Sequence, residues 1–366
     1  MMGNVGGRVA TERALRGYLL EEALAWLLRN SGYSLLTEGD KDESELILKG
    51  STLEVRGRGA EHQVDVLGQF PFTPAFSLPI RLFLEAKFYD KSRPCGLTVV
   101  RNAHGVINDV NQNFVPGSGS QPRRRYHYSY ALFSTSGFTE PAQRFAIAHQ
   151  ISLVDLSGDS FTWLRDLVHR MAAQLCAAAP RGQVPGRVVS WIRTTLRGRL
   201  NIPRELQEGL DHELAERGTL LSLNREVLPA LDDFVSGLTD HAEAELLIGF
   251  PAAPFILPLN TTNRQQFLAY ASQKPLHPIR IQRTGEDGSA EWAITPRNLD
   301  SKGYRLTFTL PKHVEDWISL AGEDERQRRS EAVKVDFLSS ITIYRMEDST
   351  LSVYQLSYEP TELRRR

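Results

Sequence analysis

Two segments of the chain, residues 63–68 and 82–88, show the period of two that is typical of strands. Successive residues of a strand point to opposite faces, so Glu85 and Lys87 lie on one face while Ala86 points into the fold. The second segment therefore predicts a strand with one apolar face and one charged face.

Asp65, on the first segment, adds a second acid twenty residues before Glu85. Two acids and a lysine on one face can hold a divalent cation beside an amine that relays protons, which is the set that metal-assisted phosphodiester cleavage needs. The alternative is that Asp65 is a solvated or turn-capping residue and that Lys87 runs its aliphatic stem along the surface. The flanking Val64 and Val66 favour the metal site.

The length of 366 residues exceeds one ordinary domain core and predicts two domains. A Pro- and Gly-containing stretch at 180–186 is typical of a linker. We therefore expect one domain at 1–170, a helix end and linker at 171–187, and a second domain at 188–366.

Composition also limits the setting in which the chain works. Cys95 and Cys176 are two isolated cysteines, which predicts a reducing compartment and argues against a disulfide framework. No apolar run approaches the roughly 20 residues of a membrane span, and the first sixteen residues do not form a signal peptide. We expect a cytoplasmic protein with no membrane partner. Basic and acidic residues are nearly balanced in each half of the chain, so neither half has the broad basic footprint that marks many DNA-binding proteins.

The first half alternates helix and strand patterns, which predicts an α/β sandwich around a mixed sheet flanked by helices. Gly32 ends the first helix as a C-terminal glycine. The expected elements are helix 13–30, strands 34–37, 45–49, 53–56, 62–68 and 80–89, helix 98–113, strand 128–135, helix 139–149 and strand 151–156.

The second half predicts an α+β domain with a largely antiparallel sheet. Helix patterns at 188–196, 204–216 and 223–238 precede a region of strands that begins near 246. Asp287-Gly288 is a hairpin signal between two strand patterns. The remaining expectations are strand 304–310, helix 312–320, a solvated loop at 323–329, and strands 333–345 and 351–358.

The first half resembles the PD-(D/E)xK nuclease superfamily, specifically its Mrr-like restriction endonuclease branch. The resemblance covers about residues 12–165. It is carried by GYLLEE at 17–22, GRGAEHQVDV at 57–66, LEAK at 84–87 and FSTSGFTEPA at 133–142. Val64 stands where the family motif usually has proline, as is common in the Mrr-like branch.

This resemblance implies roles for five residues. Asp65 is expected to be the central metal ligand, Glu85 the second, and the Ala86 carbonyl a third oxygen donor. Lys87 is expected to orient or deprotonate the attacking water and to offset charge on the phosphate. Glu21 is expected to bind a second metal or a metal-bound water, or else to be a plain solvent-facing helix acid. The expected cofactor is Mg²⁺, with Mn²⁺ as a substitute.

Basic residues outside this set are candidates for nucleic-acid binding. Arg123, Arg124 and Arg125 follow a glycine- and serine-rich loop, which suits an arm that grips phosphates. The alternative is a solvated loop. Lys91 and Arg101 follow the catalytic strand and are expected to flank the phosphate, although Arg101 can equally be an ordinary helix-surface charge.

The sequence thus predicts a Mg²⁺-dependent endonuclease that hydrolyses DNA phosphodiester bonds, in restriction or anti-phage defence. The C-terminal domain is expected to recognise the target, a small-molecule activator or a protein partner. Cutting both strands of a duplex predicts a homodimer or higher oligomer. The alternative is a non-cleaving DNA-binding or assembly component whose nuclease fold is structural, or active only in a complex.

Overall fold

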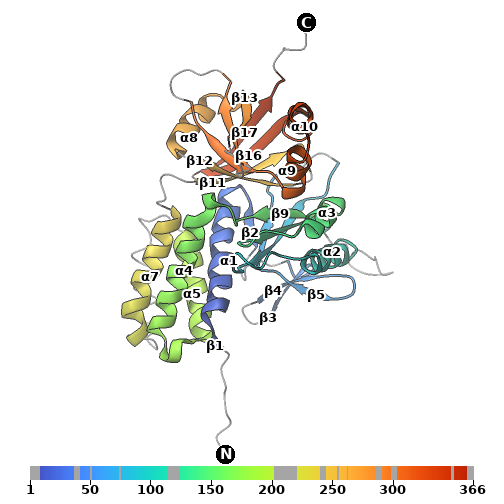
Figure 1. Cartoon of the computed structure of the whole chain (residues 1–366). Helices are drawn as coiled ribbons and strands as arrows, with labels where there is room; N and C mark the ends of the chain where they lie inside the picture. Colours follow the sequence, from blue (N-terminus) through green and yellow to red (C-terminus); the bar gives the residue numbers. More distant parts are fainter. Residues whose placement is uncertain are drawn as a thin grey trace, which may run out of the picture. The chain divides into compact units, whose positions relative to one another are not determined.

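The computed structural model of the chain describes residues 9–36, 42–49, 52–73, 76–113, 124–201, 221–239, 245–253, 255–261, 263–284, 291–297, 303–347 and 350–360. The chain divides into two compact units (Figure 1). The helical unit contains Met1–Leu27, Ala86–Phe88 and Ser157–His241. The sheet-and-barrel unit contains Leu28–Glu85, Tyr89–Leu156 and Ala242–Arg366.

Long helices form the helical unit and run alongside one another in Figure 1. They are α1 (Glu12–Asn30, which continues into the other unit), α4 (Thr162–Ala178), α5 (Gly186–Asn201) and α7 (Leu221–Thr239). α7 packs against both α4 and α5. The expected linker contains the end of α4, a 3-10 turn at Pro180–Gly182 and the strand β10 (Val184–Pro185), which pairs with β1 (Val9–Ala10). The helix expected at 204–216 lies outside the described residues.

A five-stranded mixed sheet organises the first half of the sheet-and-barrel unit, in the order β2-β6-β7-β8-β9. β2–β6 and β6–β7 are antiparallel, whereas β8–β9 is parallel. The strands are β2 (Ser34–Leu36), β6 (Val66–Gln69), β7 (Ile80–Lys87), β8 (His127–Ser134) and β9 (Ser152–Asp155). This confirms the predicted α/β class with a mixed sheet flanked by helices.

Two helices, α2 (Leu97–Asn111) and α3 (Glu140–Ala148), complete the core of this sheet. Buried apolar side chains of both helices pack in one cluster with Phe83, Tyr130 and Leu132. Gly32 ends α1 at a φ of 88°, as predicted, and a Cβ at this position would lie 2.6 Å from Leu351 Cδ1. The close approach and the left-handed backbone both require glycine.

The single strand predicted at 62–68 is wrong, because the chain changes sheets in the middle of it. β5 (Glu61–Gln63) belongs to a separate antiparallel sheet with β3 (Leu46–Lys49) and β4 (Thr52–Arg56), whereas β6 pairs with β2 and β7. Val64 and Asp65 lie between the two strands. Asp65 therefore sits at a bend, immediately before a strand of the main sheet.

The strands of the C-terminal region close into a seven-stranded barrel, which corrects the prediction of a largely antiparallel sheet. Closure depends on a parallel pair between β13 and β17, while the other pairs are antiparallel. The strands are β11 (Glu245–Pro251), β12 (Leu257–Thr261), β13 (Leu276–Arg283), β14 (Glu291–Pro296), β15 (Leu306–Thr309), β16 (Ser340–Glu347) and β17 (Thr350–Tyr358). The pairing of β13 with β14 confirms the hairpin, whose predicted turn lies outside the described residues.

Three helices connect the barrel strands: α8 (Arg264–Gln273), α9 (Lys312–Ser319) and α10 (Glu323–Asp336). α10 replaces the loop predicted at 323–329 and the first part of the strand predicted at 333–345. Its first turn carries three acids and its last turn carries Lys334, an arrangement that favours a helix through its dipole.

Within the described residues, none of the helices combines the length and the apolar character that crossing a membrane requires. Cys95 and Cys176 are both free thiols and both are buried.

Candidate active site

Asp65 and Glu85 lie at the same end of the β6–β7 pair. The register pairs Gln69 with Arg81 and Val66 with Leu84, the last pair at this end. Asp65 comes immediately before Val66, at a bend outside the paired residues, and Glu85 comes immediately after Leu84 on β7. The two acids that the sequence singled out therefore flank the same pair of strand residues.

Tyr130, on the neighbouring strand β8, contacts Glu85 and lies near the charge of Asp65, and the sequence interpretation missed it. Its Oη donates a hydrogen bond of 2.5 Å to Glu85 Oε2, and its ring stacks on Phe83 with centroids 4.9 Å apart. Burial raises the pKa of the Tyr130 phenol far above its usual range, and the charges of Glu85 and Asp65 raise it further. The Tyr130 hydroxyl is therefore a hydrogen-bond donor to Glu85.

Ala86 and Lys87 follow Glu85 on the same strand. Glu85 and Lys87 are half-buried, whereas Ala86 between them is buried. This alternation agrees with the predicted strand, in which the charged side chains share a face. The Ala86 carbonyl lies in the strand backbone between the two charged residues.

Glu21 lies on α1 and forms an ion pair within the helical unit. Arg193 on α5 donates from Nη2 to Glu21 Oε2 at 2.6 Å and from Nε to Glu22 Oε1 at 2.7 Å. Arg197, one turn later, donates to both oxygens of Glu22 at 2.8 and 3.0 Å. The Glu21 side chain is 12% exposed and that of Glu22 is 1% exposed. Glu22 is thus committed to two arginines, and Glu21 is bonded to Arg193.

The donor set of Asp65 and Glu85 fits Mg²⁺. Among the described residues, no group of three or more Asp, Glu, His or Cys side chains is placed to hold a metal. Mg²⁺ does not need such a group, because it keeps several waters and is commonly bound through one or two carboxylates and the substrate phosphates. Both acids and the Ala86 carbonyl offer hard oxygen donors of the kind that this ion prefers.

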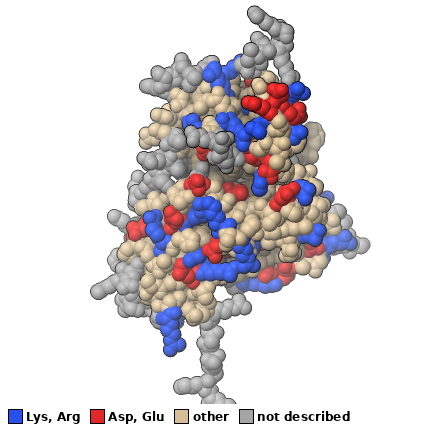
Figure 2. Space-filling view, viewed as in Figure 1, with Lys and Arg blue, Asp and Glu red and all other residues tan. Residues whose placement is uncertain are grey.

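The predicted nucleic-acid contacts are exposed where the structure describes them. Lys91 lies in the connection between β7 and α2, and Arg124 and Arg125 precede β8. Arg101, on α2, lies 5.8 Å from the ring centre of Phe145. Arg123 lies outside the described residues. Basic and acidic side chains are interspersed over the face shown in Figure 2.

Asp109, on α2, organises the turn that leads into β5. Its carboxylate accepts hydrogen bonds from the backbone N–H groups of Gly59 and Ala60 at 2.8 and 3.1 Å, and it lies 2.8 Å from His62 Nε2. The bond with His62 is the main reason why the pKa of Asp109 lies below its usual range. His62 therefore holds a turn through Asp109. The Gly57-Arg58-Gly59 sequence was the available signal for a tight turn here.

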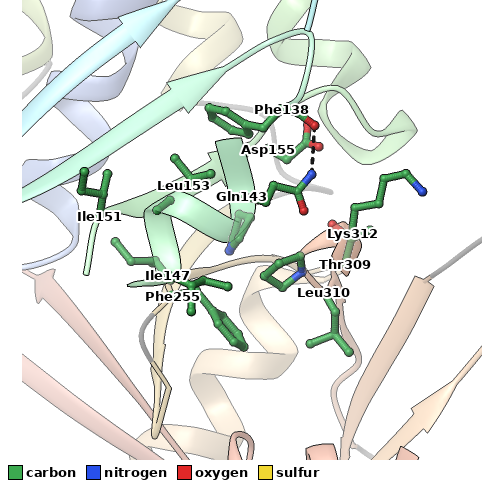
Figure 3. A pocket seen from close by; sticks show the side chains of 14 residues that line it. Phe138, Gln143, Ile147, Ile151, Leu153, Asp155, Phe255, Thr309, Leu310 and Lys312 are labelled. Carbon is green, nitrogen blue, oxygen red and sulfur yellow. Dashed lines mark hydrogen bonds between the residues drawn. The ribbon is translucent and has the colours of Figure 1, made fainter. Parts of the chain in front are cut away.

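A small cavity lies between α3 and the barrel, within the sheet-and-barrel unit (Figure 3). Its volume is about 40 Å³, which holds about three waters at roughly 10–15 Å³ each and is too small for a nucleobase. Gln143 at its edge donates to the Phe138 carbonyl at 2.9 Å and accepts from the His313 backbone N–H at 3.2 Å. We therefore assign this region a structural role in joining α3 to α9.

Comparison with known proteins assigns no family. No family model matches the chain, and no curated protein matches it. One solved structure, described as a protein of unknown function, AF1548, is similar over 60% of this chain and 98% of its own. The sequence identity is 18% and the TM-score is 0.33, so this likeness carries no argument about fold or activity.

Proposed function

We propose that the chain is a Mg²⁺-dependent endonuclease that hydrolyses DNA phosphodiester bonds, in restriction or anti-phage defence. One observation carries the proposal: Asp65 and Glu85 flank the paired residues Val66 and Leu84 of adjoining strands, and Lys87 shares a face of β7 with Glu85. The resemblance of the surrounding sequence to the PD-(D/E)xK nucleases supports the same chemistry.

The residues of the chain have distinct tasks in this reaction. Asp65, Glu85 and the Ala86 carbonyl hold the cation, which when bound stabilises charge on the phosphate and lowers the pKa of water. Lys87 Nζ either orients the attacking water or accepts its proton, and it offsets the charge that develops on the phosphate. Lys91 and Arg101 bind the flanking phosphates. A homodimer presents two such centres, one for each strand of a duplex.

Plasmid cleavage tests the proposal. Wild type is expected to nick or cut DNA with Mg²⁺ and to lose activity with EDTA. Asp65→Asn and Glu85→Gln are expected to slow cleavage about 10³-fold, since the loss of a metal ligand removes several kcal/mol of transition-state stabilisation. The matched control is Glu359→Gln, at an exposed acid of the sheet-and-barrel unit. Identical behaviour of wild type and Asp65→Asn on every duplex and single-stranded substrate contradicts the proposal.

The ion pair of Glu21 with Arg193 favours a second candidate function, because it occupies the acid expected to serve a second metal. In this case the chain binds DNA without cleaving it, or cleaves only in a complex that its C-terminal barrel recruits. DNA binding in EDTA by wild type, with no cleavage in Mg²⁺ or Mn²⁺, is the expected result. Mass measurement with candidate partners then separates a binding module from a component of an assembly.

A further inference from the structure

Tyr130 is a buried side chain that contacts a proposed metal ligand without being a ligand itself. It is 3% exposed, and its hydroxyl donates to Oε2 of Glu85 at 2.5 Å. The stack on Phe83 and the surrounding core fix the ring, so that the hydroxyl has little freedom to leave this oxygen.

We propose that Tyr130 is a positioning residue that reserves one oxygen of Glu85 and makes this carboxylate a one-oxygen ligand, selective for a small divalent cation. The inference rests on the proposed function, since it requires Glu85 to bind the metal. It goes beyond the proposed function because it names Tyr130 as the residue that determines which divalent cation the site binds.

The selectivity follows from how the two candidate cations use a carboxylate. Ca²⁺ takes 6–8 oxygens at about 2.3–2.6 Å and often binds both oxygens of one carboxylate. Mg²⁺ requires an octahedron at about 2.0–2.1 Å and takes one oxygen from each carboxylate. A phenol bonded to Oε2 competes with a cation for that oxygen and so disfavours two-oxygen binding. Tyr130 therefore favours Mg²⁺ over Ca²⁺ at Glu85.

Tyr128 supplies a matched control two residues earlier on the same strand. It is 2% exposed, and its hydroxyl donates to Glu45 Oε2 at 3.1 Å. It is thus a second buried tyrosine bonded to a carboxylate, but Glu45 is not one of the proposed ligands. Tyr128→Phe and Tyr130→Phe each delete one oxygen from β8. Tyr130→Phe takes the donor from Glu85, whereas Tyr128→Phe takes the donor from Glu45 and also removes an acceptor that Arg81 Nη1 contacts at 2.9 Å.

Metal affinity provides a readout that does not depend on cleavage. Binding of Mn²⁺ to the full chain is followed by electron paramagnetic resonance, and Mg²⁺ and Ca²⁺ are then titrated as competitors. Tyr130→Phe is expected to weaken Mg²⁺ binding about tenfold, the usual effect of removing a group that orients a ligand. The affinity for Ca²⁺ is expected to fall less, because Ca²⁺ can then also bind Oε2 of Glu85. The ratio of Ca²⁺ affinity to Mg²⁺ affinity therefore rises. Tyr128→Phe is expected to leave this ratio unchanged.

The outcomes separate this inference from the proposed function. If Asp65→Asn abolishes Mn²⁺ binding while Tyr130→Phe keeps both affinities and their ratio, the role of Tyr130 is refuted and the metal site stands. If wild type and Asp65→Asn bind Mn²⁺ equally, the metal site and this inference fall together. Phe83→Leu is a second variant, which keeps the hydroxyl and loosens the stack beneath it. Phe83→Leu is expected to raise the ratio of Ca²⁺ to Mg²⁺ affinity by a smaller factor than Tyr130→Phe. The inference is overturned if both variants fold and neither raises this ratio.

Discussion

Arg193 donates a hydrogen bond of 2.6 Å to Glu21, the acid that the resemblance assigns to a second metal or its water. The ring centre of Tyr18 lies 5.1 Å from the same guanidinium. A cation therefore already occupies the helix carboxylate, and any divalent ion that uses Glu21 has to compete with it. The pair is a barrier to metal binding if Glu21 is a ligand, and a simple structural contact if it is not.

Replacing the competing guanidinium distinguishes these roles. Arg193→Met is expected to strengthen Mn²⁺ binding severalfold, because it removes the positive charge from Glu21, while Arg197 still satisfies both oxygens of Glu22. Arg197→Met is the matched control, since Arg197 contacts Glu22 in this network. Equal effects of the two variants in an electron paramagnetic resonance titration would show that Glu21 has no share in metal binding.

Lys91 should contribute to DNA affinity through a phosphate rather than through a base. Lys91→Gln is expected to weaken binding to all sequences alike and to reduce the slope of log K against log salt by about 0.9, the value for one phosphate contact. Fluorescence anisotropy between 50 and 200 mM salt, roughly the range over which such contacts are lost, provides the measurement. Arg170→Gln, at an exposed position of α4, is the control, and an identical slope for both variants excludes Lys91 from the interface.

Arg81 should contribute strongly to stability, because its 2% exposed side chain donates to three polar groups at once. It donates to Asp42 at 2.5 Å, Tyr128 at 2.9 Å and Gln69 at 3.2 Å. Arg81→Lys is expected to cost about 3 kcal/mol in urea unfolding, since one ammonium cannot reach all three partners. Arg280→Lys, exposed on β13, is expected to change stability by less than about 0.5 kcal/mol. Equal costs would show that the buried network does not stabilise the fold.

His277 should make the stability of the barrel depend on pH. Its Nδ1 donates to the Lys274 carbonyl, and in the neutral ring its Nε2 accepts from Tyr304 Oη, both at 2.6 Å. Burial lowers the pKa of His277 from 6.5, and the unfolded chain therefore binds more protons as the pH falls. Stability is expected to be complete above pH 6.5 and to fall below it, by at most about 1.4 kcal/mol per pH unit for this proton. Urea unfolding at several pH values provides the measurement.

His277→Asn tests whether this ring is responsible. The variant is expected to be less stable at neutral pH, because it loses buried hydrogen bonds, and to show a smaller loss between neutral and acidic pH. Burial also lowers the pKa of His104 and His313, so a residual dependence of the same sign is expected. A slope equal to that of wild type would assign the acid sensitivity to other groups.

Two glycines should respond oppositely to alanine. At Gly57 a Cβ would lie 2.0 Å from Asp109 Oδ2 and 2.7 Å from the Ala60 carbonyl, so Gly57→Ala is expected to disrupt the turn at a cost of about 1–3 kcal/mol. At Gly105, within α2, a Cβ would meet no neighbouring atom within 4 Å, and Gly105→Ala is expected to stabilise the chain by about 0.5–1 kcal/mol. Shifts of the same sign in thermal unfolding would contradict this assignment.

Local sequence patterns predicted the secondary-structure elements that neighbouring residues determine. The alternation at 80–89 predicted β7, and Gly32 predicted the end of α1, because strand faces and helix ends are set by neighbouring residues. Asp65 and Glu85 lie at the same end of the β6–β7 pair, but Asp65 stands at a bend and not within the strand that the pattern predicted. The break at Val64 was not predictable in this way, since it depends on which strands pair on either side of it.

Contacts between distant segments account for what the sequence did not reveal. Barrel closure joins residues of β13 and β17 that are far apart in the chain. Arg193 and Glu21 are 172 residues apart, and Tyr130 and Glu85 are 45 apart. Tyr130 left no distinctive signal, since β8 also carries the hydroxyls of Tyr128, Ser129 and Ser134, and only the strand order of the sheet shows which acid it meets.

The parallel pair that closes the barrel also determines when the barrel can complete its folding during synthesis. Leu276 pairs with Gln355, so a nascent chain must emerge from the ribosome by about 80 further residues before β13 acquires this neighbour. Until then one edge of β13 offers unpaired N–H and C=O groups to other chains, the usual origin of aggregation during translation. The exposed Arg280 and Arg283 lie on this strand, where like charges discourage two unfinished barrels from joining.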